Sequence, residues 1–249
     1  MLFKPKTYRD SFSKERFQSF VVTYKESDLW IGMNADSYKE EMETLALETV
    51  KSLADALEQY MAEEPFFKKS LKPCPVSENA PQAAQQMAAA AEKAGVGPTA
   101  AWSGTFSEQV GKALLENFSI QELVVENDGD CFLKLQSALV LPIFAGESPL
   151  SGMAGLEIQA AQTPLGICTS AGTSGTSRSF GKADAVLIAC KDAALADALA
   201  TGLGNLIKKP ADVEKVLNRA ERMEEIISAV LICDDQIGIR GEFELNILG

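Results

Sequence analysis

Residues 166–205 read GICTSAGTSGTSRSFGKADAVLIACKDAALADALATGLGN and join a small-residue loop, an apolar run and the start of a helix. Nearly every residue from 169 to 181 is Gly, Ser, Thr or Ala, which lets the backbone approach a ligand and supplies hydroxyl and N–H donors. The apolar run 185–190 predicts a strand, and Asp192 is suited to N-capping the helix that follows it. The stretch therefore predicts a binding loop beside a strand and a helix.

On this helix Asp197 and Thr201 are four residues apart, so their oxygens project from one face. One hard cation, or one metal bound to a phosphate, could take both oxygens. The alternative is a local hydrogen bond between the two side chains on a solvated face, which is common for Asp and Thr. Spacing alone leaves these two interpretations open.

Composition limits the classes of partner and chemistry. The formal net charge of −12 over 249 residues argues against nucleic acid or an anionic membrane as a partner, since either would need clustered Lys and Arg. Histidine is absent, so any chemistry must use Asp, Glu, Lys, Cys, hydroxyls, backbone groups or a hard metal. The five cysteines are widely spaced and form no C-x-x-C pair, and no apolar run approaches a membrane span, so we expect a cytoplasmic, soluble protein without disulfides.

The order of predicted elements indicates an α+β fold. Strands are expected at 17–23, 29–33, 122–126, 130–136, 138–144, 154–160, 185–190, 229–233, 236–239 and 243–247, and helices at about 37–62, 82–93, 100–117, 192–205 and 213–226. Ser37 with Glu40 predicts a capping box at the first helix, and 243–247 is expected to close the sheet. Strands arrive in pairs, which favours a duplicated ββααββ plan with helices on one face of antiparallel sheets. We therefore expect a single domain over 1–249, with internal halves at 16–137 and 138–249.

Six ordered segments of this chain resemble a prokaryotic family related to the ApbE flavin transferases. They are AGVGP at 94–98, VVENDGD at 124–130, FAGESPL at 144–150, GICTSAGT at 166–173, SFGKADAV at 179–186 and ADALAT at 196–201. The resemblance spans roughly residues 8–249. ApbE proteins are Mg²⁺-dependent enzymes that split FAD and attach FMN to a Thr or Ser of a target protein, and their fold is related to the tunnelling-fold group. The resemblance thus implies a tunnelling-fold-like, ApbE-like architecture.

The resemblance also implies site residues. In ApbE enzymes a segment like 196–201 supplies metal ligands, which points to Asp197 and Thr201, with a backbone carbonyl at Ala101 or its neighbour Ala100 as a third ligand. Asp197 is then the residue expected to be catalytic. The ApbE Gly-Gly-Asp turn matches 128–130, and its flavin-site Thr-Ser-Gly matches 169–172. The residues expected to contact the cofactor, at the turn and along the loop, are Glu126, Asn127, Gly129, Asp130, Thr169, Ser170, Gly172, Thr173, Arg178 and Lys182.

Three functions stay open. The first is a Mg²⁺-dependent FAD:protein FMN transferase-like enzyme, in which Arg178 or Lys182 steadies phosphate oxygens and a protein supplies the acceptor Ser or Thr. The second is a non-catalytic module that binds flavin or a related nucleotide, since ApbE enzymes carry a His-containing segment where this chain has 178–184. The third is a ligand-free structural protein whose small-residue loops pack subunits into a homo-oligomer.

Overall fold

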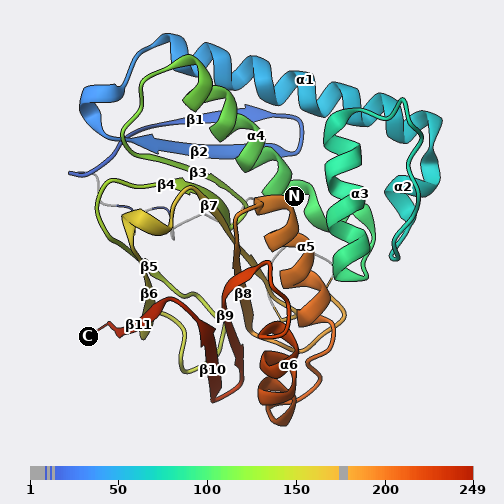
Figure 1. Cartoon of the computed structure of the whole chain (residues 1–249), viewed down its shortest axis with the longest axis vertical. Coiled ribbons are helices and arrows are strands. Elements are labelled where there is room, and N and C mark those ends of the chain that lie inside the picture. The colour runs from blue at the N-terminus through green and yellow to red at the C-terminus, as the bar shows by residue number, and fades with distance from the viewer. Residues whose placement is uncertain (1–8, 10–11, 13–14, 174–178, 249) are drawn as a thin grey trace.

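The structure is a computed structural model, and it describes residues 9, 12, 15–173 and 179–248. Within these residues, the strands form one large and one small sheet (Figure 1). The large sheet has the order β1-β2-β3-β4-β7-β8-β9-β10, and every neighbouring pair is antiparallel. Its strands are β1 (Gln18–Tyr24), β2 (Ser27–Met33), β3 (Leu123–Asn127), β4 (Asp130–Lys134), β7 (Leu165–Ser170), β8 (Ala185–Cys190), β9 (Ile226–Cys233) and β10 (Gln236–Gly241). The small sheet, in the order β11-β6-β5, contains β5 (Leu139–Pro142), β6 (Ala154–Ile158) and β11 (Glu244–Ile247).

Helices cover one face of the large sheet, and the small sheet covers the other. The helices are α1 (Glu41–Glu63), α2 (Pro65–Lys69), α3 (Gln82–Ala94), α4 (Trp102–Asn117), α5 (Ala193–Gly204) and α6 (Val213–Ala220). α4 packs on β3 and β4, α5 packs on β7 and β8, and α3 lies against α5 on the outside (Figure 1). The predicted α+β fold, with antiparallel sheets and helices on one face, is confirmed.

Two apolar cores follow from the alternation of side chains along the strands. On β3, Val125 faces the helices while Val124 faces the small sheet, and both side chains are fully buried. Because both faces of the central strands are covered, β8 is apolar throughout, and β3, β4 and β7 carry polar residues only at their ends. The arrangement of β1-β2 with β3-β4, and of β7-β8 with β9-β10, is compatible with the predicted duplication.

Several local predictions are confirmed by backbone geometry. Asp128 and Gly129 have φ values of 53° and 97° and form a two-residue turn between the strands predicted at 122–126 and 130–136. The helix predicted at about 82–93 ends at Ala94, where Gly95 caps it with a left-handed φ of 73°. The Asp192 side chain caps α5 by accepting a hydrogen bond from Leu195 N at 2.8 Å. Turn and cap residues in the sequence therefore indicate where β3, α3 and α5 begin or end.

Three element predictions are wrong. Ser37 lies in a short 3₁₀ turn and does not cap α1; its hydroxyl accepts a hydrogen bond from Gln121 N instead. α6 ends at Ala220, and the expected C-terminal part of that helix is a turn followed by the start of β9. β11 pairs with β6 in the small sheet, so residues 243–247 do not close the large one.

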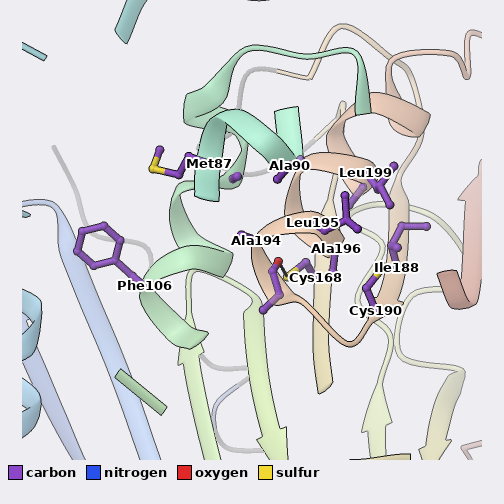
Figure 2. Packing of buried hydrophobic residues seen from close by; sticks show 14 of the residues in the cluster. Met87, Ala90, Phe106, Cys168, Ile188, Cys190, Ala194, Leu195, Ala196 and Leu199 are labelled. Atoms are coloured by element: carbon purple, nitrogen blue, oxygen red, sulfur yellow. Dashed lines mark hydrogen bonds between the residues drawn. The ribbon is translucent and has the colours of Figure 1, made fainter. Parts of the chain in front are cut away.

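β7 is the main element that the sequence did not predict, because its glycine and polar residues are typical of a loop. A Cβ at Gly166 would lie 2.3 Å from Ala193 Cα, so the glycine is needed where α5 crosses the strand. Thr169 and Ser170 consequently belong to a strand of the large sheet rather than to the predicted loop. Figure 2 shows the packing at this crossing, where Cys168 on β7 lies against Ala194, Leu195 and Ala196 of α5.

Candidate functional site

A cavity of about 400 Å³ lies at the end of the large sheet, between the helices and the small sheet. One wall comes from the N-terminal turn of α4 and from α5, with Trp102, Ser103, Asp197 and Thr201. The floor is the β3-β4 turn and the end of β7, and the remaining wall is the segment 141–144. Its volume is within the range of small-molecule sites, roughly 300–1,000 Å³.

Asp197 and Thr201 both line this cavity, as their spacing on one helix face predicted. Asp197 is half-buried in the cavity wall, and its Oδ2 accepts a hydrogen bond from Gly104 N at 2.9 Å. Burial raises the pKa of Asp197 to about 7, although the N–H groups of Gly104 and Ser103 act in the opposite direction. The carboxyl group is therefore held in an environment that disfavours an uncompensated negative charge.

Asp130 brings a second buried carboxyl group to the cavity. It is the first residue of β4, is 5% exposed, and accepts a hydrogen bond from Thr169 N at 3.0 Å. Burial, and then the charge of Asp197, raise the pKa of Asp130 well above its usual range. The two carboxyl groups thus interact electrostatically, although 67 residues separate them in sequence.

Two polar atoms in this part of the structure are buried without a hydrogen-bond partner among the described residues. They are the Ser170 hydroxyl oxygen and the Asn127 Oδ1, in residues that are 4% and 1% exposed. Ser170 lines the cavity, and Asn127 is paired with Asp130 across the β3-β4 ladder. Buried polar atoms are nearly always hydrogen-bonded in folded proteins, so the Ser170 hydroxyl, which faces the cavity lining, marks a place where a polar ligand would complete the site.

Glu126 supports the turn that forms the floor. Its Oε2 accepts a hydrogen bond from Arg9 Nε at 2.5 Å, and its Oε1 accepts one from Gly129 N at 2.7 Å. Arg9 also donates to the Asp28 carboxylate at 2.8 Å, which ties the turn to β2. Glu126 and Gly129 both line the cavity, so the ion pair between Glu126 and Arg9 holds the floor of the cavity in place.

The remaining predicted residues lie elsewhere or outside the described residues. The Thr173 hydroxyl donates to Asp184 at 2.8 Å, and Gly172 N donates to the Ala183 carbonyl at 2.8 Å, so both fasten the segment before β8. Neither of them lines the cavity, and neither does Lys182. Arg178 lies outside the described residues. Ala100 lines the cavity, whereas the Ala101 carbonyl accepts the Thr105 hydroxyl at 2.6 Å.

Sequence reasoning missed the residues that tertiary structure brings to the site. Phe12 and Trp102 line the cavity and give it an aromatic surface. Glu108 on α4 is 1% exposed and accepts a hydrogen bond from Ala193 N, the first residue of α5, at 2.8 Å. A buried glutamate on a helix has no local signature that would have pointed to α5, because its partner lies 85 residues further along the chain.

A family model described as AbpE bacteria matches residues 9–244. The chain belongs to this family. The predicted kinship with ApbE is thereby confirmed. A "UPF0280 protein" of Methanocella arvoryzae is 38% identical over 197 residues, which cover 79% of this chain and 80% of the relative. A second "UPF0280 protein", of Methanococcus vannielii, is 38% identical over 190 residues and covers 75% and 76% of the two chains.

Solved structures give the same fold at much lower sequence identity. The flavinyl transferase ApbE of Pseudomonas stutzeri, solved in its apo form, superposes with a TM-score of 0.56 at 14% identity, over 92% of this chain and 95% of that one. At this identity the match establishes the fold of the AbpE bacteria family member described here. Its activity has to be argued from the residues of the site.

Proposed function

We propose that this cavity binds FAD or a related nucleotide together with Mg²⁺, and that the protein transfers FMN from FAD to a Ser or Thr of an acceptor protein. The observation that carries the proposal is the meeting of Asp197 and Thr201 with a second buried carboxyl group, Asp130, in one ligand-sized cavity. The ApbE-like fold and the membership of the AbpE bacteria family support it as an analogy.

The side chains of the cavity fit a hard cation. Oxygen is what Mg²⁺ prefers as a ligand, and Asp197 and Thr201 present a carboxylate and a hydroxyl from adjacent turns of α5. Within the described residues, no Lys, Arg or His lines the cavity. When bound, Mg²⁺ would supply the positive charge that offsets the diphosphate of the nucleotide. Asp197 and Thr201 would hold it, with the backbone carbonyl of Ala100, which lines the cavity, as a third ligand.

The cavity also fits a flavin or an adenine ring. Phe12, Trp102 and Phe144 give it aromatic surface, and Phe144 is 48% exposed at its edge. Thr169 and Ser170 at the end of β7 provide hydroxyl groups for the polar edge of a ring or for a ribose. The chain's own residues would therefore bind and orient the nucleotide, since the lining combines apolar faces with a few polar groups.

A second candidate is a binding module without transferase activity. The observation that favours it is the absence of histidine from the whole sequence, which removes the commonest general base. The thiols near the site do not replace it, because burial raises the pKa of Cys131 and Cys168 well above the usual value.

Fluorescence of FAD tests the binding. We expect the protein to quench FAD fluorescence only when Mg²⁺ is present, and Asp197→Asn to abolish the Mg²⁺-dependent part. The matched control is Asp184→Asn, because Asp184 is a buried, hydrogen-bonded carboxylate that does not line the cavity. Quenching that is equal in wild type and Asp197→Asn would refute the proposed metal site. FMN found by mass spectrometry on a Ser- or Thr-containing peptide would select the transferase over the binding module.

A further inference from the structure

We infer that Asp130 and Ser170 are ligands of the same divalent cation as Asp197, and that this site binds the cation without any nucleotide. The inference rests on the proposed function for the presence of a cation at Asp197, and it adds two ligands from the sheet. The cation would then be held between two layers of the fold, by a strand pair and by a helix.

Strand register places Asp130 and Ser170 on the same face of the large sheet. On β4, Phe132 faces the helices, since a Cβ at Gly111 of α4 would lie 2.3 Å from its ring. Asp130 is two residues before Phe132 and shares its face. On β7, the Cys168 thiol donates to the Ala193 carbonyl of α5, and Ser170 is two residues further along. Both side chains therefore face the helix layer, where Asp197 lines the same cavity.

The two carboxyl groups have no compensating cation among the described residues. No ion pair involves Asp130 or Asp197 in that part of the chain. Their hydrogen-bond donors are neutral: the backbone N–H groups of Thr169, Gly104 and Ser103, and the Cys168 thiol beside Asp130. Each of these bonds fixes a carboxyl group in place without neutralising it. Buried like charges repel each other strongly unless a cation or a proton compensates them, and a divalent cation would compensate both.

The unpartnered Ser170 hydroxyl is an independent indication of a ligand. The residue is 4% exposed and lines the cavity, and its hydroxyl oxygen makes no hydrogen bond to any described residue. A buried hydroxyl without a partner is destabilising, so a functional reason for its retention is expected. A hydroxyl oxygen beside two carboxylates is a suitable neutral ligand for a hard cation.

The ligand atoms offered by the cavity indicate which class of cation would bind. In the part of the chain that the structure describes, no cluster of three or more His, Cys, Asp or Glu side chains could hold a metal. Two carboxylates must therefore be completed by neutral oxygens, here Ser170 and Thr201. An all-oxygen set of this kind suits Mg²⁺ or Mn²⁺ and disfavours the softer metals that prefer Cys or His.

Binding of Mn²⁺ alone tests the inference, with electron paramagnetic resonance to count free Mn²⁺ and Mg²⁺ as the competitor. We expect wild type to bind one Mn²⁺ without nucleotide, and Asp130→Asn to weaken binding about tenfold or more, because ligand charge sets affinity at such sites. Ser170→Ala should weaken it by a smaller factor while both carboxylates stay in place. Asp184→Asn and Ser228→Ala are the controls, since they alter a buried carboxylate and a buried hydroxyl outside the cavity. Circular dichroism establishes that each variant is folded.

The outcomes separate this inference from the proposed function. Unchanged Mn²⁺ affinity in both folded variants, Asp130→Asn and Ser170→Ala, would overturn the two new ligands. Wild type that binds Mn²⁺ only after FAD is added would overturn the nucleotide-free site, while the proposed function would stand. Mn²⁺ binding that depends on Asp130 in a protein that never quenches FAD fluorescence would support the cation site and refute the nucleotide.

Discussion

The carboxylate of Asp197 on α5 accepts a hydrogen bond from the backbone N–H of Gly104, in the first turn of α4, at 2.9 Å. A reciprocal bond runs from Ala193 N, at the start of α5, to Glu108 on α4 at 2.8 Å. Each helix thus caps the other with a carboxyl group, from the half-buried Asp197 and the buried Glu108, and these groups satisfy N–H groups that have no partner within their own helix. The helices can approach this closely because residue 104 is a glycine. A Cβ there would lie 2.2 Å from the Ala193 carbonyl oxygen and would clash with it.

The stability of the protein should depend on pH through the raised pKa of Asp197. Its pKa is about 7 in the folded protein, against an ordinary value of about 3.9, so it stays protonated in the folded state while the unfolded chain ionises. Its contribution to stability is therefore complete below about pH 4 and is lost as the pH rises towards 7. In EDTA, we expect the urea unfolding free energy to fall between pH 5 and pH 7.5, and to fall less in Asp197→Asn. Asp130 acts in the same direction, so some slope should remain; equal slopes in both proteins would contradict the prediction.

Removal of the Glu108 carboxylate, which caps the N-terminus of α5 from α4, should destabilise the protein. Glu108→Ala leaves Ala193 N without its acceptor and removes the ion pair with Lys112, so we expect a loss of about 2 kcal/mol. Glu116→Ala, at an exposed position on the same helix, should change stability by less than about 0.5 kcal/mol. Chemical denaturation at one pH measures both variants, and a similar small effect for the two would argue against the cap.

Ser170→Ala should stabilise the cation-free protein, in contrast to an ordinary buried serine. The Ser170 hydroxyl has no partner among the described residues, and its removal should raise the unfolding free energy by about 1 kcal/mol. Ser228→Ala should lower it by about 1 kcal/mol, because the Ser228 hydroxyl accepts a hydrogen bond from Phe243 N at 2.9 Å. Thermal unfolding in EDTA compares the two, and a destabilised Ser170→Ala would show that its hydroxyl is already satisfied.

The proposed metal site requires the hydroxyl group of Thr201 as a ligand. Thr201→Val keeps the shape of the side chain but removes the hydroxyl, so we expect the Mg²⁺-dependent affinity for FAD to fall about tenfold. Thr201→Ser keeps the hydroxyl and should bind within a small factor of wild type. Titration of FAD fluorescence at fixed Mg²⁺ measures both. Equal affinities for the Val and Ser variants would exclude the hydroxyl as a ligand.

Local sequence signals determined much of the fold and part of the site. The turn at Asp128 and Gly129, the end of α3 at Gly95 and the cap at Asp192 depend on backbone preferences of single residues, so they could be predicted. The common face of Asp197 and Thr201 follows from the geometry of one helix. In each case the determining residues are close in sequence.

Tertiary structure decided the rest, since the determining contacts join distant segments. Gly166 appeared as part of a loop, yet it lies in β7 because α5 crosses the strand there. Residues 243–247 have strand character whichever sheet they join, and only pairing with β6 assigned them. Asp130, Asp197 and the unpartnered hydroxyl of Ser170 reach one cavity only because of how β4, β7 and α5 pack together. Residue type and spacing fix which side chains share a face of one element; only the packing of layers fixes which faces meet.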